Sequence, residues 1–203
     1  SVFAVVDCTG HGVPGAFMSM IGNRLLIDAV KEKGIIKPVD ILEEIDHRIR
    51  IALMQEETSN NDGMDICVCT LEYIGKNKCK IDFAGAKRPL FYSDIRNKKM
   101  EHIRGTVRGI GGKKRIREKA QKLFEEHSLT INKGEMIYLT SDGYFDLQSP
   151  GRKKFGRQGF MQLLEENMNK PLIEQKEMLM DAFHLHKGSE QQIDDITILG
   201  IKI

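Results

Sequence analysis

The stretch VFAVVDCTGHGVPG at residues 2–15 decides how the chain can fold. A run of apolar residues leads into Asp7, which is the pattern of a buried strand that ends in a carboxylate. Glycines then flank His11, and Pro14 suits the first turn of a helix. Apolar residues at helical spacing follow. The sequence therefore predicts a strand that ends at Asp7, a tight loop, and a helix over 13–32.

The rest of the chain mixes helices with short strands. Pro38 opens a second helix, whose apolar residues extend to Leu53. A turn is predicted at 59–63, and glycines with basic residues at 104–116 predict a mobile loop. The further predicted strands are 64–74, 79–84, 89–93, 99–103, 127–131, 135–141 and 196–203, and the further helices are 119–126, 156–167 and 171–187. Helices that pack on antiparallel strands indicate an α+β fold.

The composition excludes several classes of protein. The 203 residues have a formal net charge of +2 and no tryptophan, which argues against a nucleic-acid-binding protein. The four cysteines form no CxxC pair, so neither a zinc site nor a disulfide framework is expected, and a reducing cytoplasm is the expected compartment. Cys67 and Cys69 share one face of a predicted strand, where we expect them to be buried as small apolar residues. No apolar run approaches the length of about 18 residues that indicates a membrane span.

Aspartates stand at three junctions between strands and loops. Asp7 ends VFAVVD, Asp142 ends MIYLTSD, and the pair Asp194 and Asp195 precedes ITILGI. A single aspartate at such a junction is commonly a turn or cap residue. Three converging carboxylates would repel one another unless cations neutralised them. Hard oxygen ligands suit Mg²⁺ or Mn²⁺ better than zinc. The pattern therefore predicts a divalent-cation site if the three junctions meet.

Five motifs carry a resemblance to a known family: DCTGHGVPGAFMSM, FAGAKRPLFY, YLTSDGYFD, FGRQGFMQLL and DDITIL. In order and spacing they resemble the SpoIIE-like bacterial serine phosphatases, a branch of the metal-dependent protein phosphatases of the type 2C class. The resemblance covers nearly the whole chain and implies a single phosphatase domain over 1–203. It also implies a sandwich of two antiparallel sheets flanked by helices, with the metal ions at one end between the sheets.

The resemblance further implies roles for single residues. Asp7 is similar to the aspartate that bridges two metal ions, and the backbone carbonyl of Cys8 would add a ligand. Asp142 and Asp194 are similar to further metal ligands, and Asp195 to a residue that supports them. The two ions, Mn²⁺ or Mg²⁺, would activate a water molecule that attacks phosphorus in line, without a phospho-enzyme intermediate.

Four residues near these motifs have two interpretations each. His11 is the candidate general acid that protonates the leaving alkoxide, and the alternative is a loop residue that packs or binds phosphate weakly. Lys87 and Arg88 are expected in a solvated turn, and the alternative is a contact with a phosphoprotein. Asp65 is expected in a structural turn, and the alternative is a position near the metals.

The start of the chain carries an expectation of its own, because Ser1 is followed at once by a strand pattern. The family resembled has a further aspartate on an upstream strand, which helps to hold the second metal. We therefore expect an N-terminally truncated domain that lacks its first strand or strands, with a weakened second-metal site and reduced or absent activity. The parent protein would carry an upstream sensor domain and, in a tethered form, a membrane segment.

The function implied by the resemblance is that of a metal-dependent protein serine/threonine phosphatase in a bacterial signalling pathway. Its substrate would be a phosphorylated regulatory protein, for example an anti-sigma-factor antagonist. The alternative is a non-catalytic module that binds a phosphoprotein or forms a homodimer. A third possibility, hydrolysis of a small phosphate ester, differs in substrate alone. No nucleic-acid partner is expected.

Overall fold

The computed structural model describes residues 1–112 and 123–203 and contains two antiparallel sheets with helices on their outer faces. In sheet A the strand order is β1-β2-β3-β7, and the short β6 also pairs with β2. These strands are β1 (Val2–Cys8), β2 (Gly63–Tyr73), β3 (Lys78–Ala86), β6 (Ile110–Gly111) and β7 (Glu126–Asn132). The α+β class and the two antiparallel sheets predicted from the sequence are confirmed.

Sheet B has the strand order β5-β4-β8-β9, again with antiparallel pairing throughout. Its strands are β4 (Leu90–Asp94), β5 (Lys99–Ile103), β8 (Met136–Thr140) and β9 (Ile198–Lys202). Strands β8 and β9 pair in space although they are far apart in sequence, because α3, α4 and α5 lie between them in the chain. These helices are α3 (Gly143–Asp146), α4 (Gly156–Asn167) and α5 (Leu172–Lys187).

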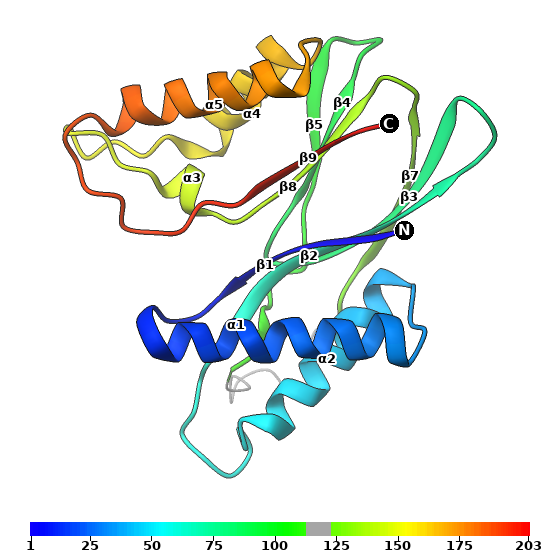
Figure 1. The fold of residues 1–203 in the computed structure, drawn as a ribbon, viewed down its shortest axis with the longest axis vertical. Coiled ribbons are helices and arrows are strands. Elements are labelled where there is room, and N and C mark those ends of the chain that lie inside the picture. Colours follow the sequence, from blue (N-terminus) through cyan, green and yellow to red (C-terminus); the bar gives the residue numbers. More distant parts are fainter. Residues whose placement is uncertain (113–122) are drawn as a thin grey trace.

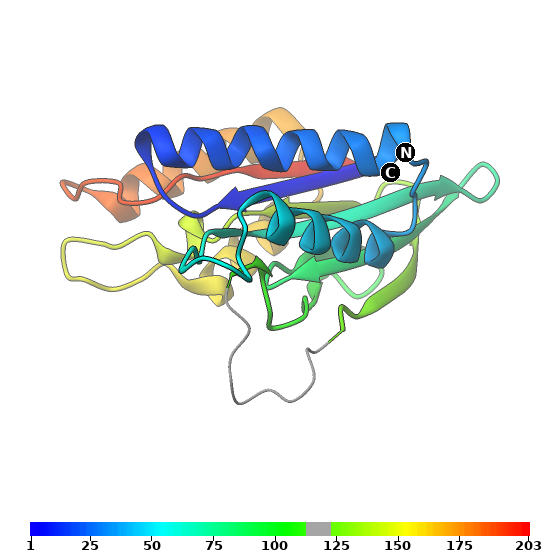
Figure 2. The same ribbon diagram turned by 90° about the horizontal axis from the view of Figure 1, so that it is seen from below.

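The helices form two outer layers (Figures 1 and 2). On sheet A lie α1 (Gly12–Ile27), its π-helical continuation η1 (Asp28–Glu32) and α2 (Pro38–Ala52). On the far side, α4 and α5 cover sheet B. The helix predicted over 13–32 is thus continuous, although its last turn is wider than an α-helix.

Period-two alternation in the strands separates the three core layers. Along β2, Ile66 and Val68 face the α1 and α2 helices, whereas Cys67 and Cys69 face sheet B. The same cluster between the sheets contains Cys79, and all three thiols are free and fully buried. The interpretation of Cys67 and Cys69 as buried apolar residues is therefore confirmed.

Two sequence predictions differ from the structure on either side of residues 113–122. Residues 123–125 have no regular structure and β7 begins at Glu126, so the helix predicted over 119–126 is wrong at its C-terminal end; its other residues lie outside the described part of the chain. The physical reason is pairing, because Glu126 stands opposite Ala84 of β3. Within the predicted loop 104–116, Ile110 and Gly111 form β6 against β2, and 113–116 lie outside the described residues.

None of the helices that the structure describes combines the length and the apolar character needed to cross a bilayer.

Candidate functional site

The loop after β1 is held by contacts that only small residues permit. The Thr9 N–H donates to the Gly63 carbonyl at 2.9 Å, and the Gly63 N–H donates to Thr9 Oγ1 at 2.9 Å. Gly10 has φ +89°, a left-handed conformation that favours glycine. A β-carbon on Gly15 would lie 2.7 Å from the Gly10 carbonyl oxygen. The small residues thus fold the loop tightly against α1 and fix the end of the strand that carries Asp7.

A second tight junction joins the Asp142 loop to the Asp194 loop at the same end of the sandwich (Figure 1). Ser141 makes the connection: its N–H donates to the Thr197 carbonyl at 3.1 Å, and its Oγ accepts from the Thr197 N–H at 3.0 Å. A β-carbon on Gly143 would lie 2.3 Å from the Asp195 carbonyl oxygen. The glycine of the SDG motif therefore allows the loop that carries the DDIT motif to pack closely against it.

Three of the predicted site residues, Asp7, Asp142 and Asp194, are brought together at this end. Burial raises the pKa of Asp7 to about 7, and the hydrogen bond and negative charge of Asp142 and the charge of Asp194 add to the rise, against the opposing effect of Arg88. Burial also raises the pKa of Asp194, helped by the charge of Asp142. In both groups burial is the largest cause, and the charge of a neighbouring carboxylate acts in the same direction.

A buried arginine stands among these carboxylates. The Arg88 side chain is 10% exposed; its Nη1 lies 2.6 Å from Asp142 Oδ2, and its Nη2 lies 2.6 Å from Asp65 Oδ2 and 3.5 Å from Asp7 Oδ2. Burial alone would raise the pKa of Asp142, but the charge and hydrogen bond of Arg88 outweigh it and hold that pKa below its usual range. Lys87 adds a second cation, with Nζ 2.9 Å from Asp65 Oδ1.

Two predictions are corrected by this arrangement. Arg88 is not in a solvated turn, because the strand connection directs it into the carboxylates. Asp65 lies within β2, in agreement with the strand predicted over 64–74, and directly opposite Asp7 of β1, so its interpretation as a structural turn residue is wrong. Like charges opposite each other destabilise a sheet unless a cation lies between them. The signal that could have revealed this is a basic pair, Lys87 and Arg88, placed between two strongly apolar strands.

The two remaining predicted residues lie at the edges of the site. His11 is exposed at the N-cap of α1, and its imidazole has no hydrogen-bond partner in the described part of the chain. Cys8 is the last residue of β1, opposite Met64, and burial raises the pKa of its thiol. The roles predicted for His11 and for the Cys8 carbonyl stay predictions.

The chemistry of the donor set fits Mg²⁺ or Mn²⁺, since Asp7, Asp142 and Asp194 offer hard oxygen ligands at a junction where backbone packs closely. Within residues 1–112 and 123–203, however, no three Asp, Glu, His or Cys side chains are arranged to hold a metal directly. The guanidinium of Arg88 is the cation that Asp7 and Asp142 contact. The donors are present, but two of the three are paired with an arginine.

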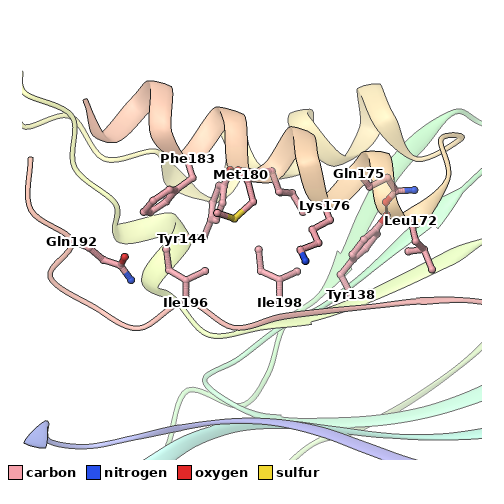
Figure 3. A pocket seen from close by; sticks show the side chains of 12 residues that line it. Tyr138, Tyr144, Leu172, Gln175, Lys176, Met180, Phe183, Gln192, Ile196 and Ile198 are labelled. Atoms are coloured by element: carbon pink, nitrogen blue, oxygen red, sulfur yellow. Dashed lines mark hydrogen bonds between the residues drawn. The ribbon is translucent and has the colours of Figure 1, made fainter. Parts of the chain in front are cut away.

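A separate cavity of about 550 Å³ lies between α5 and strands β8 and β9 (Figure 3). Tyr138, Tyr144, Phe183, Ile196 and Ile198 give it largely apolar walls. Asp7, Asp65, Asp142 and Asp194 do not line this cavity. The charged chemistry of the molecule is therefore at the strand ends and not in this cavity.

Comparison with known proteins identifies the family of the chain. The family model of stage II sporulation protein E (SpoIIE) matches residues 1–203. The chain belongs to the SpoIIE family. As a SpoIIE-type phosphatase domain it is similar to the PP2C domain of SiaA from Pseudomonas aeruginosa, with 30% identity and a TM-score of 0.83 over 100% of this chain and 74% of that one. No curated protein sequence matches it significantly.

A second solved structure shares the fold of this SpoIIE-family domain. It contains the PP2C phosphatase domain and a fragment of the regulatory domain of SpoIIE from Bacillus subtilis, with 19% identity and a TM-score of 0.66. The match covers 99% of this chain and 54% of that one. The domain therefore spans about half of that relative's solved chain.

Proposed function

We propose that this SpoIIE-family domain hydrolyses phosphoserine or phosphothreonine on a bacterial regulatory protein, with Mn²⁺ or Mg²⁺ as cofactor. The observation that carries the proposal is the convergence of Asp7, Asp142 and Asp194 at one end of the sandwich, where Arg88 pairs with both Asp7 and Asp142. Membership of the SpoIIE family supports the phosphatase activity. RsbX, which was solved in complex with magnesium, shares the fold at 17% identity and a TM-score of 0.56.

The ligands in this proposal are the carboxylates of Asp7, Asp142 and Asp194 together with the Cys8 carbonyl. Divalent cations held there supply positive charge for the phosphate and activate a water molecule. The chain's own contribution is positional. The Ser141 contacts with Thr197 and the close approach at Gly143 hold the Asp142 and Asp194 loops at a fixed separation.

His11 is the proposed general acid in this reaction. It lies on the loop that leaves Asp7, and its exposed imidazole is open to a bound substrate. A proton delivered to the serine or threonine oxygen would assist its departure as an alkoxide. If His11 only binds phosphate, replacing it with glutamine will raise KM and leave kcat almost unchanged.

The partner in this proposal is a phosphorylated regulatory protein, of which an anti-sigma-factor antagonist is one example, and the reaction takes place in the cytoplasm. The alternative predicted from the sequence is a non-catalytic module that binds a phosphoprotein or dimerises. Turnover discriminates between the two, because a binding module would retain the phosphoprotein without releasing inorganic phosphate.

The test is phosphate release from a phosphoserine peptide by the full-length protein, with and without Mn²⁺. We expect release that depends on Mn²⁺, and no release above background for Asp142→Asn and Asp194→Asn. Asp181→Asn is the matched control, because Asp181 is exposed on α5 and belongs to neither loop. A comparison with p-nitrophenyl phosphate separates peptide from small-ester specificity. Full activity in either site variant would refute the proposal.

A further inference from the structure

The charges around Arg88 do not balance. Asp7, Asp65, Asp142 and Asp194 supply four carboxylates, and among the described residues their ion pairs come from Arg88 and Lys87 alone. The Arg88 guanidinium reaches three of the four. In a partly buried site such a surplus is costly unless further cations enter. The arginine therefore occupies the position where positive charge is most needed.

The backbone around Arg88 is built to hold it there. A β-carbon on Gly85 would lie 2.2 Å from the Arg88 carbonyl oxygen, and one on Gly105 would lie 2.5 Å from the same atom. Lys87 has φ +61°, which is uncommon for a residue with a side chain, and Pro89 disfavours a helical conformation at Arg88. The connection between β3 and β4 therefore fixes the backbone of Arg88 against two glycines and directs its side chain to the strand ends.

The Arg88 side chain has one polar atom without a partner and open space beside it. The Arg88 Nε is buried and has no hydrogen-bond partner in the described part of the chain. A buried donor without a partner is a cost that the fold must offset elsewhere. Beside the guanidinium lies a cavity of about 360 Å³, lined by Arg88, Asp142, Phe145, Asp146 and Arg157 among others. A long side chain on a fixed backbone thus has open space next to the carboxylates.

We propose that Arg88 is a tethered counter-cation: its guanidinium pairs with the carboxylates of Asp7 and Asp142 and competes with a divalent cation for them. This inference rests on the proposed function in one respect, since it takes Asp7 and Asp142 as metal ligands. Without the guanidinium the metal-free carboxylates repel one another. With it, a divalent cation must compete with a cation that is attached to the chain. Arg88 therefore lowers the affinity of the site for metal.

The test is Mn²⁺ binding to the full chain, measured by isothermal titration calorimetry without substrate. We expect Arg88→Gln and Arg88→Met to bind Mn²⁺ about tenfold or more tightly than the wild-type chain, because a competing charge is gone. Arg48→Gln is the matched control, since it removes the same charge from α2, where Arg48 pairs with Asp28 and Glu44. It should leave the Mn²⁺ affinity unchanged.

A second measurement covers the case in which a variant loses stability without metal. Mn²⁺ should then raise its melting temperature more than it raises that of the wild-type chain, since the ion supplies the missing charge. Equal or weaker Mn²⁺ binding by folded Arg88 variants, or an equal or smaller thermal shift, would overturn the proposal. Suppose that the Arg88 variants give such a result, but that Asp142→Asn lacks the Mn²⁺ binding and the hydrolysis of the wild-type chain. The proposed function then stands, and only the role of Arg88 is refuted.

Discussion

Two buried clusters of arginine and carboxylate lie in this molecule, and they are balanced differently. In the Asp46 cluster (Glu43, Asp46, Arg50 and Arg108), two acids face two arginines among the described residues. Asp46 accepts from Arg50 at 3.1 and 3.2 Å, from Arg108 at 2.9 Å, and from the Gly111 N–H at 2.7 Å. In the Arg88 cluster (Asp7, Asp65, Asp142, Lys87 and Arg88), three acids face two cations: Arg88 pairs with all three acids, and Lys87 pairs with Asp65.

The pKa directions follow from this difference. In the Asp46 cluster, burial alone would raise the pKa of Asp46, but Arg50, Gly111 and Arg108 outweigh it, so the pKa lies below its usual range. In the Arg88 cluster, burial and neighbouring carboxylates raise the pKa of Asp7 to about 7. A satisfied cluster fastens α2 to the segment that carries β6. The Arg88 cluster has more carboxylates than cations, which supports the proposed cation site at the strand ends.

The largest expected effect on stability is at the balanced cluster. Asp46→Ala should lower the free energy of unfolding by about 3–5 kcal/mol, because it leaves two buried guanidiniums short of a carboxylate. Urea denaturation measures the change. Glu44→Ala, on the same helix but in a more exposed ion pair, serves as the control and should cost under about 1 kcal/mol. Equal effects of the two variants would show that the Asp46 cluster carries no special stability.

A smaller effect is expected at the junction that supports the unbalanced cluster. Gly143→Ala places a β-carbon 2.3 Å from the Asp195 carbonyl and should force the two acidic loops apart, at a cost of about 1–3 kcal/mol. Mn²⁺ affinity should fall as well. The control is Gly151→Ala, where the nearest atom is the Ser149 Oγ at 3.8 Å. Unchanged Mn²⁺ affinity in folded Gly143→Ala would argue that the spacing of the loops is irrelevant to metal.

The smallest of these effects is a difference in the pH dependence of the metal-free chain. Folded Asp7 keeps its proton up to about pH 7, whereas the unfolded residue loses it near 3.8. Within that window the folded state binds more protons, so stability falls as pH rises. In Asp7→Asn, the free energy of unfolding should fall by about 1–2 kcal/mol less than in the wild-type chain over this pH range.

The Asp46 cluster should give the opposite slope. Because its folded pKa is depressed, its contribution is present above about pH 4 and is lost as the pH falls through the folded pKa. Unfolding curves measured from pH 3 to pH 8 separate the two residues. If Asp7→Asn leaves the fall between pH 4 and pH 7 unchanged, the unfavourable ionisation of Asp7 is not its cause.

Much of this fold could be predicted because its signals are local. The alternation of β2 and the apolar run before Asp7 indicate strands from neighbouring residues alone. The three aspartates at strand ends were found in the same way. Their convergence could not be predicted from neighbouring residues, because it depends on how Ser141 and Gly143 pack against the loop before β9.

The parts that could not be predicted depend on partners distant in sequence. Asp65 faces Asp7 because of the register between β1 and β2, across more than fifty residues. Arg88 is buried because those two carboxylates and Asp142 surround it, although its own sequence neighbourhood resembles an exposed turn. The helix predicted over 119–126 is wrong at its C-terminal end, because β7 begins there and pairs with β3.

The central claim is that the unbalanced carboxylates form a divalent-cation site. The most direct test is calorimetric titration of Mn²⁺ into the full wild-type chain and into Asp7→Asn at pH 8, where Asp7 is ionised. The wild-type chain should bind Mn²⁺, and Asp7→Asn should bind it at least about tenfold more weakly. Absence of binding by the wild-type chain, or equal affinities in the two chains, would contradict the claim.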